Sequence, residues 1–518
     1  MKGAECLLRT LTANGVDTCF MNPGTSEMQF VSALDQVPAM RSLLCLFEGV
    51  CSGAADGYAR MLRRPAATLL HLGPGLGNGL ANFHNARKAH SPVVSIVGQH
   101  TTQHLRVDAP LSADIEAFAR TVSEHVRTVA CAADLGGDAA AAVAAACAPP
   151  GQVATLIVPA DFSWSEAGPP AGLAPRAGFA EPDRCRVREI ASLVRRGGSV
   201  GLLLGGSTLL DRGIETAGQL AAATGVRVFA SRYGARLACG GGRFAPLRLP
   251  YFPEAAASAL AGLEHLVLVE CKAPVSFFGY PGRPSVLVPE GSAVHTLVPI
   301  EGDGVQALAA LLEECGRGPG AQDHATRPKG SPPELTPGAE LTPDAVGRTL
   351  ARCLPHDAIV SEELVSSGAA VLRHLEAAPR FDLLPVTGGS IGQGLPVAVG
   401  AAVACPGRKV IALEADGSSM YTPQSLWTMA RERLDVVIVI LANRRYRILD
   451  IEMERTGGSA GPRASEMLDL RHPELDWVKL SEGMGVEATR ATTTDEFLAQ
   501  WTEAVKRPGP RLIEAVTA

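Results

Sequence analysis

The residues whose types most clearly suggest chemistry lie in the run EADGSS, from Glu414 to Ser419, and at Asn443. Asp416 offers a carboxylate and Asn443 a neutral oxygen. A Mg²⁺ ion that holds a diphosphate takes one or two such protein oxygens beside phosphate oxygens and water. Gly417 and Ser418 can offer backbone N–H groups and a hydroxyl to phosphate oxygens at the turn. We therefore expect Asp416 and Asn443 to be magnesium ligands, although a DGS sequence alone is most often a solvated turn.

The elements around this pair fit a diphosphate site. Lys409 to Leu413 and Val436 to Leu441 have the continuous apolar composition of buried parallel strands. Thr422 to Arg433, between them, has apolar residues at helical spacing. Both candidate ligands would follow the carboxyl end of a strand, where open parallel sheets bind cofactors. The predicted strands therefore favour a metal and phosphate site over a simple turn.

These motifs resemble those of the thiamine diphosphate-dependent enzymes, a family that includes acetolactate synthase, pyruvate decarboxylase and benzoylformate decarboxylase. The family has a GDGS-type turn followed, after a fixed interval, by one or two asparagines, and here the two motifs are ADGSS and LANRRY. Ala415, Ala442 and Arg444 depart from the pattern, which commonly has glycine, asparagine and glycine there. The resemblance implies that the backbone carbonyl of Arg445 completes the metal ligands. Because a carbonyl does not depend on the side chain, these substitutions leave it in place.

A second set of motifs, near the N-terminus, resembles the pyrimidine-binding domain of the same family in order and spacing. They are FMNPGTSEMQF (Phe20 to Phe30), LFEGVCSGAADGYAR (Leu46 to Arg60) and HLGPGLGNGLANFHNARKAHSPVV (His71 to Val94). The resemblance implies that Glu48 hydrogen-bonds the aminopyrimidine ring and promotes loss of a proton from the thiazolium carbon. From the residues alone, an acid at the start of a helix, favoured by the helix dipole, is the commoner explanation of Glu48.

The same resemblance indicates a reaction centre around Thr25, Ser26 and His71. His71 could donate a hydrogen bond to a substrate carboxylate or relay a proton, although a core histidine at a strand end explains it equally well. The segment SFFGYPG (Ser276 to Gly282) departs from benzoylformate decarboxylase, because it has aromatic residues where that enzyme has a second active-site histidine. Proton delivery would then differ, or the reaction would end in something other than protonation.

Further residues match cofactor-contact positions of the family: Pro23, Asn78, Ser366 and Ile391. Ile391, in TGGSIGQGLPVAVGAAVA, matches the bulky residue that forces the cofactor into its bent shape, whereas a lone isoleucine is otherwise most often a core residue. Ile448 and Leu449 match substrate-pocket positions. Their apolar side chains suggest a medium-sized acyl group rather than a charged one.

Two other groups of side chains have simpler explanations than chemistry. His84, His90, His100 and His104 recur in the N-terminal part, but their spacings do not place pairs on one helical face. We therefore expect separate surface or core roles for them rather than a metal site. The basic run RRYRILDIEMER, from Arg444 to Arg455, is expected to be a helix. Its arginines could meet an anionic substrate, although a solvated face balanced by its own acids is the more common arrangement.

Length and composition favour three α/β domains, each a mostly parallel sheet flanked by helices. Two Pro/Gly-rich stretches, Ser163 to Pro182 and Gly316 to Glu340, have the composition of linkers. We therefore predict a pyrimidine-binding domain over residues 1–165, a central domain over 183–316 and a domain that binds diphosphate and Mg²⁺ over 341–518.

The central part of the chain is the least informative. SVGLLLGGSTLL (Ser199 to Leu210), a predicted helix to Ala223 and the strand Val226 to Ala230 resemble a nucleotide-binding βα unit. The segment lacks a complete G-x-G-x-x-G, so the signal is weak. Some relatives bind FAD or a coenzyme A nucleotide in this domain, and many keep the fold without a ligand. We expect an empty domain and keep FAD as an alternative.

Charge and cysteine usage limit the partners. The 518-residue chain has a net charge of −6 and a sequence pI near 6.1, which argues against nucleic acid or an anionic membrane as the main partner. Its twelve cysteines are scattered singly without a C-x-x-C pair, a pattern typical of reduced cytosolic thiols. There is no signal-peptide pattern and no apolar run of about eighteen residues. We expect a cytoplasmic protein that binds neither membrane nor nucleic acid.

Together these features predict an enzyme that uses thiamine diphosphate and Mg²⁺ to decarboxylate a 2-oxo acid. The overall pattern resembles acetolactate synthase-like proteins, so we expect transfer of the acyl carbanion to an acceptor carbonyl. Release of an aldehyde, as by benzoylformate decarboxylase, is the alternative. Because the family builds each active site from two subunits, the resemblance implies a homodimer or homotetramer. A catalytically silent paralogue and a flavin-linked oxidase are the rival classes.

Overall fold

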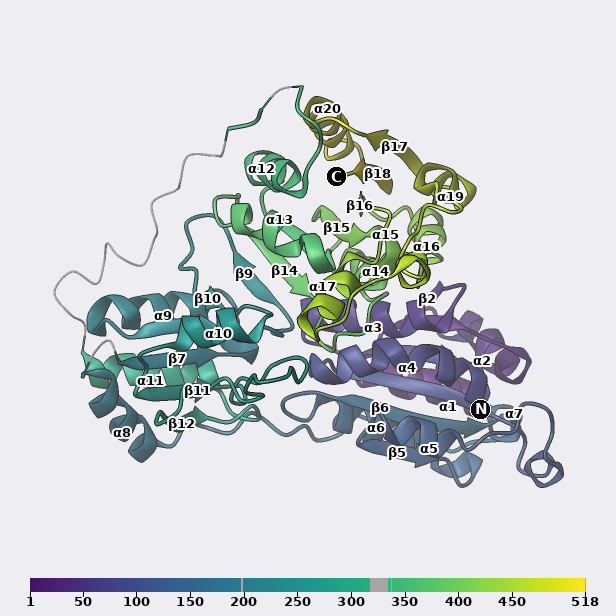
Figure 1. The fold of residues 1–518 in the computed structure, drawn as a ribbon. Helices are drawn as coiled ribbons and strands as arrows, with labels where there is room; N and C mark the ends of the chain where they lie inside the picture. The colour runs from purple at the N-terminus through teal and green to yellow at the C-terminus, as the bar shows by residue number, and fades with distance from the viewer. Residues whose placement is uncertain (197–198, 317–333, 337, 518) are drawn as a thin grey trace.

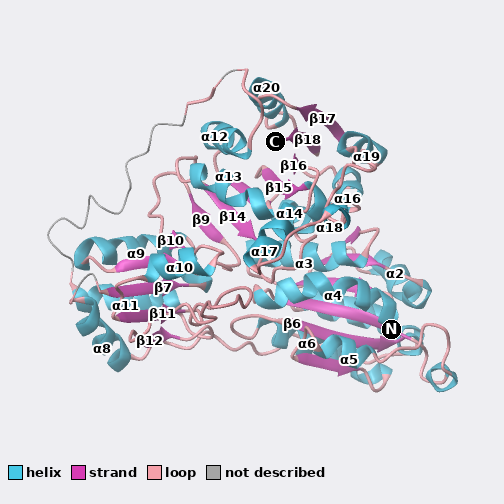
Figure 2. Ribbon diagram, in the orientation of Figure 1, coloured by secondary structure: helices cyan, strands magenta, loops and turns pink. Residues whose placement is uncertain are grey.

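The computed structural model describes residues 1–196, 199–316, 334–336 and 338–517, so most of the predicted linker from Gly316 to Glu340 lies outside the described residues. The chain forms three α/β units, each with a sheet at its centre (Figure 1). Helices cover the strands of every unit (Figure 2). The predicted fold class, three mostly parallel sheets flanked by helices, is confirmed. No helix among the described residues is both long and apolar enough to cross a membrane.

The first unit has a six-stranded parallel sheet with the order β2-β1-β3-β4-β6-β5. Its strands are β1 (Thr18–Asn22), β2 (Arg41–Leu44), β3 (Ala66–Leu70), β4 (Val93–Gln99), β5 (His125–Thr128) and β6 (Val153–Pro159). Its helices are α1 (Gly3–Ala13), η1 (Thr25–Glu27), α2 (Met28–Ala33), η2 (Leu34–Gln36), α3 (Glu48–Leu62), α4 (Leu72–Lys88), η3 (His104–Val107), α5 (Ile115–Arg120), η4 (Ala132–Asp134), α6 (Leu135–Cys147) and α7 (Ala160–Trp164). β3, β4 and β6 are buried along their whole length, as expected for parallel strands covered on both faces.

The central unit has a five-stranded parallel sheet with the order β10-β8-β7-β11-β12. Its strands are β7 (Val200–Leu204), β8 (Arg227–Ala230), β10 (Leu247–Arg248), β11 (His265–Val269) and β12 (Ala293–Val298). Its helices are α8 (Arg184–Val194), η5 (Gly206–Leu209), α9 (Asp211–Thr224), α10 (Pro253–Leu260) and α11 (Gly304–Cys315). The strand–helix–strand order predicted between Ser199 and Ala230 is present.

The third unit has a seven-stranded sheet with the order β17-β18-β16-β15-β13-β14-β9. Its strands are β13 (Ala358–Glu363), β14 (Phe381–Pro385), β15 (Val410–Ala415), β16 (Val436–Ala442), β17 (Glu487–Ala491), β18 (Arg511–Val516) and β9 (Leu237–Cys239). Its helices are α12 (Pro343–Cys353), η6 (Val365–Ser367), α13 (Gly368–Leu375), α14 (Gly394–Ala404), α15 (Asp416–Ser419), α16 (Ser425–Arg431), α17 (Arg447–Arg455), α18 (Pro462–Glu466), α19 (Trp477–Gly483) and α20 (Thr494–Ala504). β9 comes from the central part of the chain and pairs antiparallel with β14, so two units share one sheet.

Two predicted helices differ in extent from the observed ones. The helix expected over Thr422 to Arg433 is limited to α16, because Pro423 lies in the preceding turn and cannot donate a backbone hydrogen bond. The helix expected from Arg444 begins only at Arg447, since Arg444 has a left-handed backbone with φ of 58°. Arg444 and Arg445 therefore belong to the loop that leaves β16.

Helix α3 lies between the first sheet and the third unit and packs closely against α14 (Figure 1). Glycines make this approach possible. A Cβ atom at Gly57 would collide with the backbone of Val397, and one at Gly400 would lie 2.6 Å from the backbone nitrogen of Tyr58. One apolar core contains side chains of both units, including Val50 and Val399. The crossing of α3 and α14 thus fixes how the N-terminal and C-terminal units are held together.

Candidate active site

Glu48 begins α3, directly after the extended residue Phe47. Its side chain is buried, and its Oε2 accepts a hydrogen bond of 3.0 Å from Nδ2 of Asn78 on α4. A Cβ atom at Gly75 would lie only 3.1 Å from the other carboxylate oxygen. Two of the predicted cofactor residues, far apart in the sequence, are therefore in direct contact.

His71 lies at the end of β3 and precedes α4. Its Nδ1 is 2.8 Å from Oε2 of Glu27, a carboxylate with only 3% of its side chain exposed. The backbone N–H of Gly24 donates to the same oxygen at 2.8 Å. Burial raises the pKa of Glu27, whereas His71 and the Gly24 N–H act in the opposite direction. If Nδ1 carries the proton, Glu27 orients the imidazole and leaves Nε2 for another partner.

Glu27 was missed in the sequence analysis, although it lies in the motif FMNPGTSEMQF. Only the fold shows its partner, because β1 and β3 are neighbours in the sheet and bring the turns that follow them together. The predicted residues Pro23 and Thr25 lie in the same turn after β1. A Cβ atom at Gly24 would collide with the ring of His71, so the turn depends on a glycine at this point.

The predicted metal ligands converge at the ends of β15 and β16. The Oδ1 atom of Asp416 accepts the N–H of Gly417 at 2.8 Å, and its Oδ2 accepts the N–H of Arg444 at 2.6 Å. Oδ1 of Asn443 accepts the N–H of Arg445 at 3.0 Å. Burial raises the pKa of Asp416 to about 6, and the backbone N–H groups oppose this shift. One carboxylate and one amide oxygen are thus held at the ends of two neighbouring strands, and both are oxygen ligands of the kind that a hard divalent cation prefers.

The residues predicted to contact the diphosphate lie near the end of β15. Ser418 is buried and its hydroxyl donates to the carbonyl of Ala415 at 3.1 Å. A Cβ atom at Gly417 would lie 2.5 Å from the ring of Tyr446, so this position has room for glycine only. Ser366 lies on η6, which contacts β15 and α17. This set of hydroxyl, amide and carboxylate groups fits a diphosphate held by Mg²⁺.

Two comparisons place the chain among known proteins. Residues 1–120 match the family profile described as "Thiamine pyrophosphate enzyme, N-terminal TPP binding domain", and residues 366–515 match "Thiamine pyrophosphate enzyme, C-terminal TPP binding domain". The chain is 48% identical to "Putative acetolactate synthase large subunit IlvX" of Mycobacterium tuberculosis (strain H37Rv), over 100% of this chain and 99% of that protein. The chain belongs to the thiamine pyrophosphate enzyme family. Thiamine pyrophosphate and thiamine diphosphate are the same molecule.

Other thiamine pyrophosphate enzymes are similar along their full length. Benzoylformate decarboxylase of Pseudomonas aeruginosa is 31% identical over 98% of this chain and 97% of its own. A solved structure of the thiamine diphosphate-dependent 4-hydroxybenzoylformate decarboxylase of Rhodococcus jostii RHA1 has a TM-score of 0.87 and 26% identity, covering 100% of this chain and 99% of that one. The family membership predicted from the motifs is therefore confirmed.

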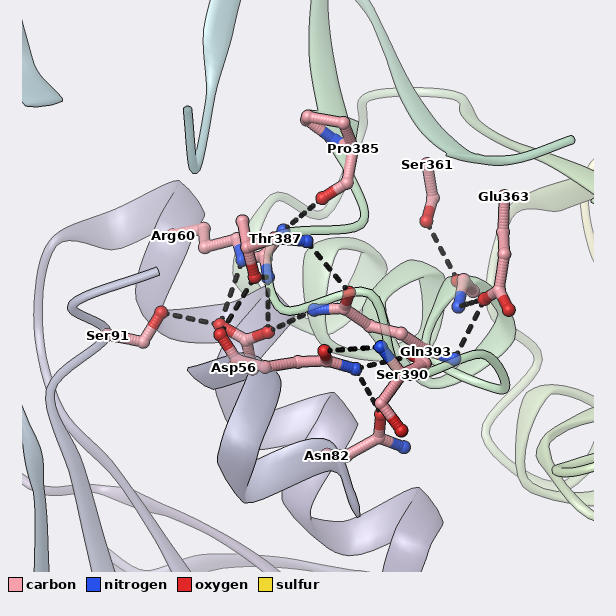
Figure 3. A network of polar contacts seen from close by, with 12 residues as sticks. Asp56, Arg60, Asn82, Ser91, Ser361, Glu363, Pro385, Thr387, Ser390 and Gln393 are labelled. Carbon is pink, nitrogen blue, oxygen red and sulfur yellow. Dashed lines mark hydrogen bonds and ion pairs between the residues drawn. The ribbon is translucent and has the colours of Figure 1, made fainter. Parts of the chain in front are cut away.

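The loop that contains Ile391 is held by buried polar groups around Ser390 and Gln393 (Figure 3). The carboxylate of Glu363, at the end of β13, accepts the backbone N–H groups of Gly392 at 2.5 Å, Gln393 at 2.8 Å and Gly394. Asn82 of α4 donates to the carbonyl of Gly392 at 3.0 Å. Burial raises the pKa of Glu363 to about 7, against those N–H donors. No sequence motif indicates a role for Glu363.

The basic run after Asn443 is occupied by ion pairs. Arg445 binds Asp450 through two hydrogen bonds of 2.5 and 2.7 Å, and Arg444 pairs with Glu474. Arg447 lies 3.5 Å from Asp450. The expectation of a basic face balanced by its own acids is met for Arg445 and Arg447 but not for Arg444, whose partner lies outside the run. The carbonyl of Arg445 accepts the N–H of Arg447 at 2.8 Å.

The predicted residues form two separate groups. Pro23, Thr25, Glu48, His71 and Asn78 belong to the first unit, and Ser366, Ile391, Asp416, Gly417, Ser418, Asn443 and Arg445 to the third. Among the described residues, no hydrogen bond or ion pair links a member of one group to a member of the other. Among the described residues there is no cluster of three or more His, Cys, Asp or Glu side chains that could hold a metal.

Proposed function

We propose that this thiamine pyrophosphate enzyme decarboxylates a 2-oxo acid with thiamine diphosphate and Mg²⁺ and transfers the acyl group to an acceptor carbonyl. The observation that carries the proposal is the buried contact between Glu48 and Asn78 in a chain that also brings Asp416 and Asn443 together. The similarity to a protein named as an acetolactate synthase large subunit supports the transfer step. When bound, the cofactor supplies the electron sink for loss of carbon dioxide.

The third unit would hold the diphosphate end. Asp416, Asn443 and the carbonyl of Arg445 are the proposed Mg²⁺ ligands. Gly417, Ser418 and Ser366 are the proposed contacts of the phosphate oxygens. Ile391 would support the bent shape of the cofactor, and its loop is well anchored by Glu363 and Asn82.

The first unit would supply the proton chemistry. Glu48 would hold a proton at the pyrimidine ring, and Pro23 and Asn78 would contact the same end of the cofactor. Thr25 and His71 bind and orient the substrate carboxylate, with the imidazole held by Glu27. Since these groups lie in different units, we propose that each site forms between two subunits of a cytoplasmic homodimer or homotetramer.

Release of an aldehyde is the second candidate function. The contact between His71 and Glu27 favours it, because an oriented imidazole can deliver a proton to a carbanion. Full-length similarity to benzoylformate decarboxylase supports the same outcome. Product analysis separates the two candidates, since only transfer yields a 2-hydroxy ketone.

The test is to incubate the protein with thiamine diphosphate, Mg²⁺ and a panel of 2-oxo acids, and to measure carbon dioxide and products. We expect Glu48→Gln to lower kcat by at least about 100-fold, the usual contribution of a positioned acid or base. Glu5→Gln is the matched control, because Glu5 is also an acid in the first turn of a helix. Undiminished turnover in Glu48→Gln would remove the proposed role. Hydrogen–deuterium exchange at the thiazolium carbon separates an active enzyme from a silent paralogue.

A further inference from the structure

The first sheet has a cavity of about 370 Å³ at the carboxyl ends of β1, β4 and β6. Its lining includes hydroxyl groups, two imidazoles and an indole: Thr25, Ser26, Thr101, His100, His104 and Trp164. Cavities at the carboxyl edge of a parallel sheet are the usual ligand sites of α/β folds, and this volume is at the small end of ligand pockets. Thr25 belongs both to this lining and to the proposed reaction centre.

The walls of the cavity are fixed by hydrogen bonds. The carboxylate of Asp161, on α7, accepts the backbone N–H of Thr102 at 3.0 Å and its hydroxyl at 2.6 Å, which ties the loop after β4 to α7. The side chain of Gln99 accepts the N–H of His100 at 2.8 Å. The rings of His100 and His104 are 5.3 Å apart, edge to face. The two imidazoles therefore have defined positions before any ligand binds.

His100 has an unsatisfied polar atom. Among the described residues its Nε2 has no hydrogen-bond partner, although buried side-chain nitrogens normally have one. This nitrogen is shielded from solvent, so a ligand reaches it only when the imidazole turns toward the cavity. Burial lowers the pKa of His100, and His104 and His71 add to this effect. A neutral imidazole still has one N–H to donate, and an approaching anion favours its protonated form.

We propose that His100 and His104, with the hydroxyl of Ser26, bind the second carboxylate of a 2-oxo dicarboxylic acid. This inference rests on the proposed function, because it names the substrate class of that reaction. The second carboxylate departs from the uncharged acyl group that Ile448 and Leu449 suggest from the sequence. The cavity's described lining contains no Lys or Arg to balance the double negative charge of a phosphate group. Hydroxyl and imidazole donors instead suit a single carboxylate. Thr25 joins the subsite to the reaction centre, so one molecule can reach both.

The test is equilibrium binding to the full chain without cofactor, measured by calorimetry. The probes are 2-oxoglutarate and 5-methyl-2-oxohexanoate, in which an isopropyl group replaces the second carboxylate. We expect the diacid to bind at least about tenfold more tightly, as a charge-assisted hydrogen bond provides. Equal affinity of the two acids for the wild-type protein would overturn the proposal without any variant.

Variants then locate the subsite. We expect His100→Phe and His104→Phe to abolish the preference for the diacid, and the exposed His356→Phe to keep it. If His100→Phe does not fold, His104→Phe decides alone, because His104 lies on the exposed helix η3. A preference that survives loss of His104 contradicts the assignment.

Different experimental results would refute the proposed substrate class and the proposed function. If the loaded enzyme releases carbon dioxide from monocarboxylic 2-oxo acids but shows no preference for diacids in binding, the subsite is refuted and the function stands. If the diacid binds through His100 and His104 but no 2-oxo acid is decarboxylated, the function is refuted and only the anion subsite remains.

Discussion

At the scale of single residues, the contact between Glu27 and His71 leads to a prediction. Glu27 acts through His71, so Glu27→Gln removes the charge that orients the imidazole but keeps a side chain of the same size. We expect kcat to fall by about tenfold or more, in the range seen when a partner that orients a histidine is replaced. KM should change little, because the substrate donors themselves remain. Steady-state kinetics over a range of pH are the measurement.

The matched control for Glu27→Gln is Asp35→Asn, an exposed carboxylate on the neighbouring helix η2. It should leave kcat unchanged. If Glu27→Gln instead raises KM alone, or loses activity only by unfolding, Glu27 is not a positioning residue. A smaller loss in Glu27→Gln than in His71→Ala is also required, since Glu27 works only through His71.

Residues inside recognisable motifs were predicted from the sequence better than the residues that hold those motifs in place. Asp416, Asn443, Glu48 and Asn78 stand in runs whose residue types indicate metal or cofactor chemistry, and the structure brings each pair together. Glu363 does not lie in such a run. Its carboxylate accepts backbone N–H groups of a loop about thirty positions later, including that of Gly392. Only the folded sheet brings the carboxylate and this loop together.

At the scale of elements, the approach of α3 and α14 gives a stability prediction. A Cβ atom at Gly400 would collide with the backbone carbonyl of Ala54, and backbone cannot move aside as a side chain can. Gly400→Ala should therefore lower the free energy of unfolding by about 2 kcal/mol, as overpacked cores do. Because α3 carries Glu48, binding of thiamine diphosphate should weaken too. Urea denaturation and calorimetry measure both effects.

Gly137→Ala is the control, because Gly137 lies within helix α6 and a Cβ atom there meets no atom of the described residues within 4 Å. This change should be neutral or stabilise by up to about 1 kcal/mol. Equal stability of the two variants would show that α3 can shift away from α14, against the tight packing inferred here.

The central unit holds a carboxylate of its own where a nucleotide phosphate would bind. Glu270 accepts the hydroxyl of Ser207 at 2.7 Å and the N–H of Gly304 at 2.6 Å, and it also accepts the N–H of Ser207. The two Ser207 donors follow β7, the position of the phosphate in nucleotide-binding βα units, and Gly304 begins α11. We therefore expect the purified protein to have no visible flavin absorption, because the anion site is already filled.

Removal of this carboxylate tests that explanation. Glu270→Ala leaves buried donors without a partner and should cost about 2 kcal/mol of unfolding free energy. Formate should restore part of this loss by occupying the vacated position, as seen by thermal unfolding with and without the anion. Glu264→Ala, an exposed acid of the same unit, should show neither the loss nor the recovery. Absence of any formate effect would contradict the idea of a filled anion site.

Apolar strands were the most predictable elements. Val436 to Leu441 was expected as a strand, and β16 extends it by one residue. Helix ends were less predictable, because Pro423 and the left-handed Arg444 set them through local backbone geometry. β9 was not expected, since a three-residue strand is too short to show a periodic pattern and is stabilised only by its pairing with β14.

At the scale of the whole molecule, a buried network joins the first and third units (Figure 3). Asp56 and Arg60, one turn apart on α3, form two hydrogen bonds of 2.8 and 2.6 Å with almost no exposure. Arg60 also donates to the carbonyl of Pro385 at 2.8 Å, and Gln393 donates to Asp56 at 2.7 Å. Because its members are more than 300 positions apart, no local sequence pattern could predict the network.

We expect this network to contribute measurably to holding the first and third units together. Asp56→Asn leaves the Arg60 guanidinium buried without a charge partner, and Arg60→Met does the same to Asp56. Each single change should cost about 3 kcal/mol of unfolding free energy, the lower end for a broken buried ion pair. The double variant should lose at least about 1 kcal/mol less than the sum of the two, because neither charge is then left alone. Chemical denaturation of the four proteins gives this coupling energy directly.

The pair Glu116 and Arg120 on α5 is the matched control, since it has the same spacing on a helix but an exposed Arg120 and a half-exposed Glu116. Its coupling should be no more than about 0.5 kcal/mol, as for surface ion pairs. If the two pairs have equal coupling, burial between the units adds nothing to the Asp56–Arg60 interaction, and the attachment of α3 to the third unit depends on apolar packing alone. A larger coupling at Asp56 and Arg60 means that the orientation of the helix that begins at Glu48 is set partly by charge.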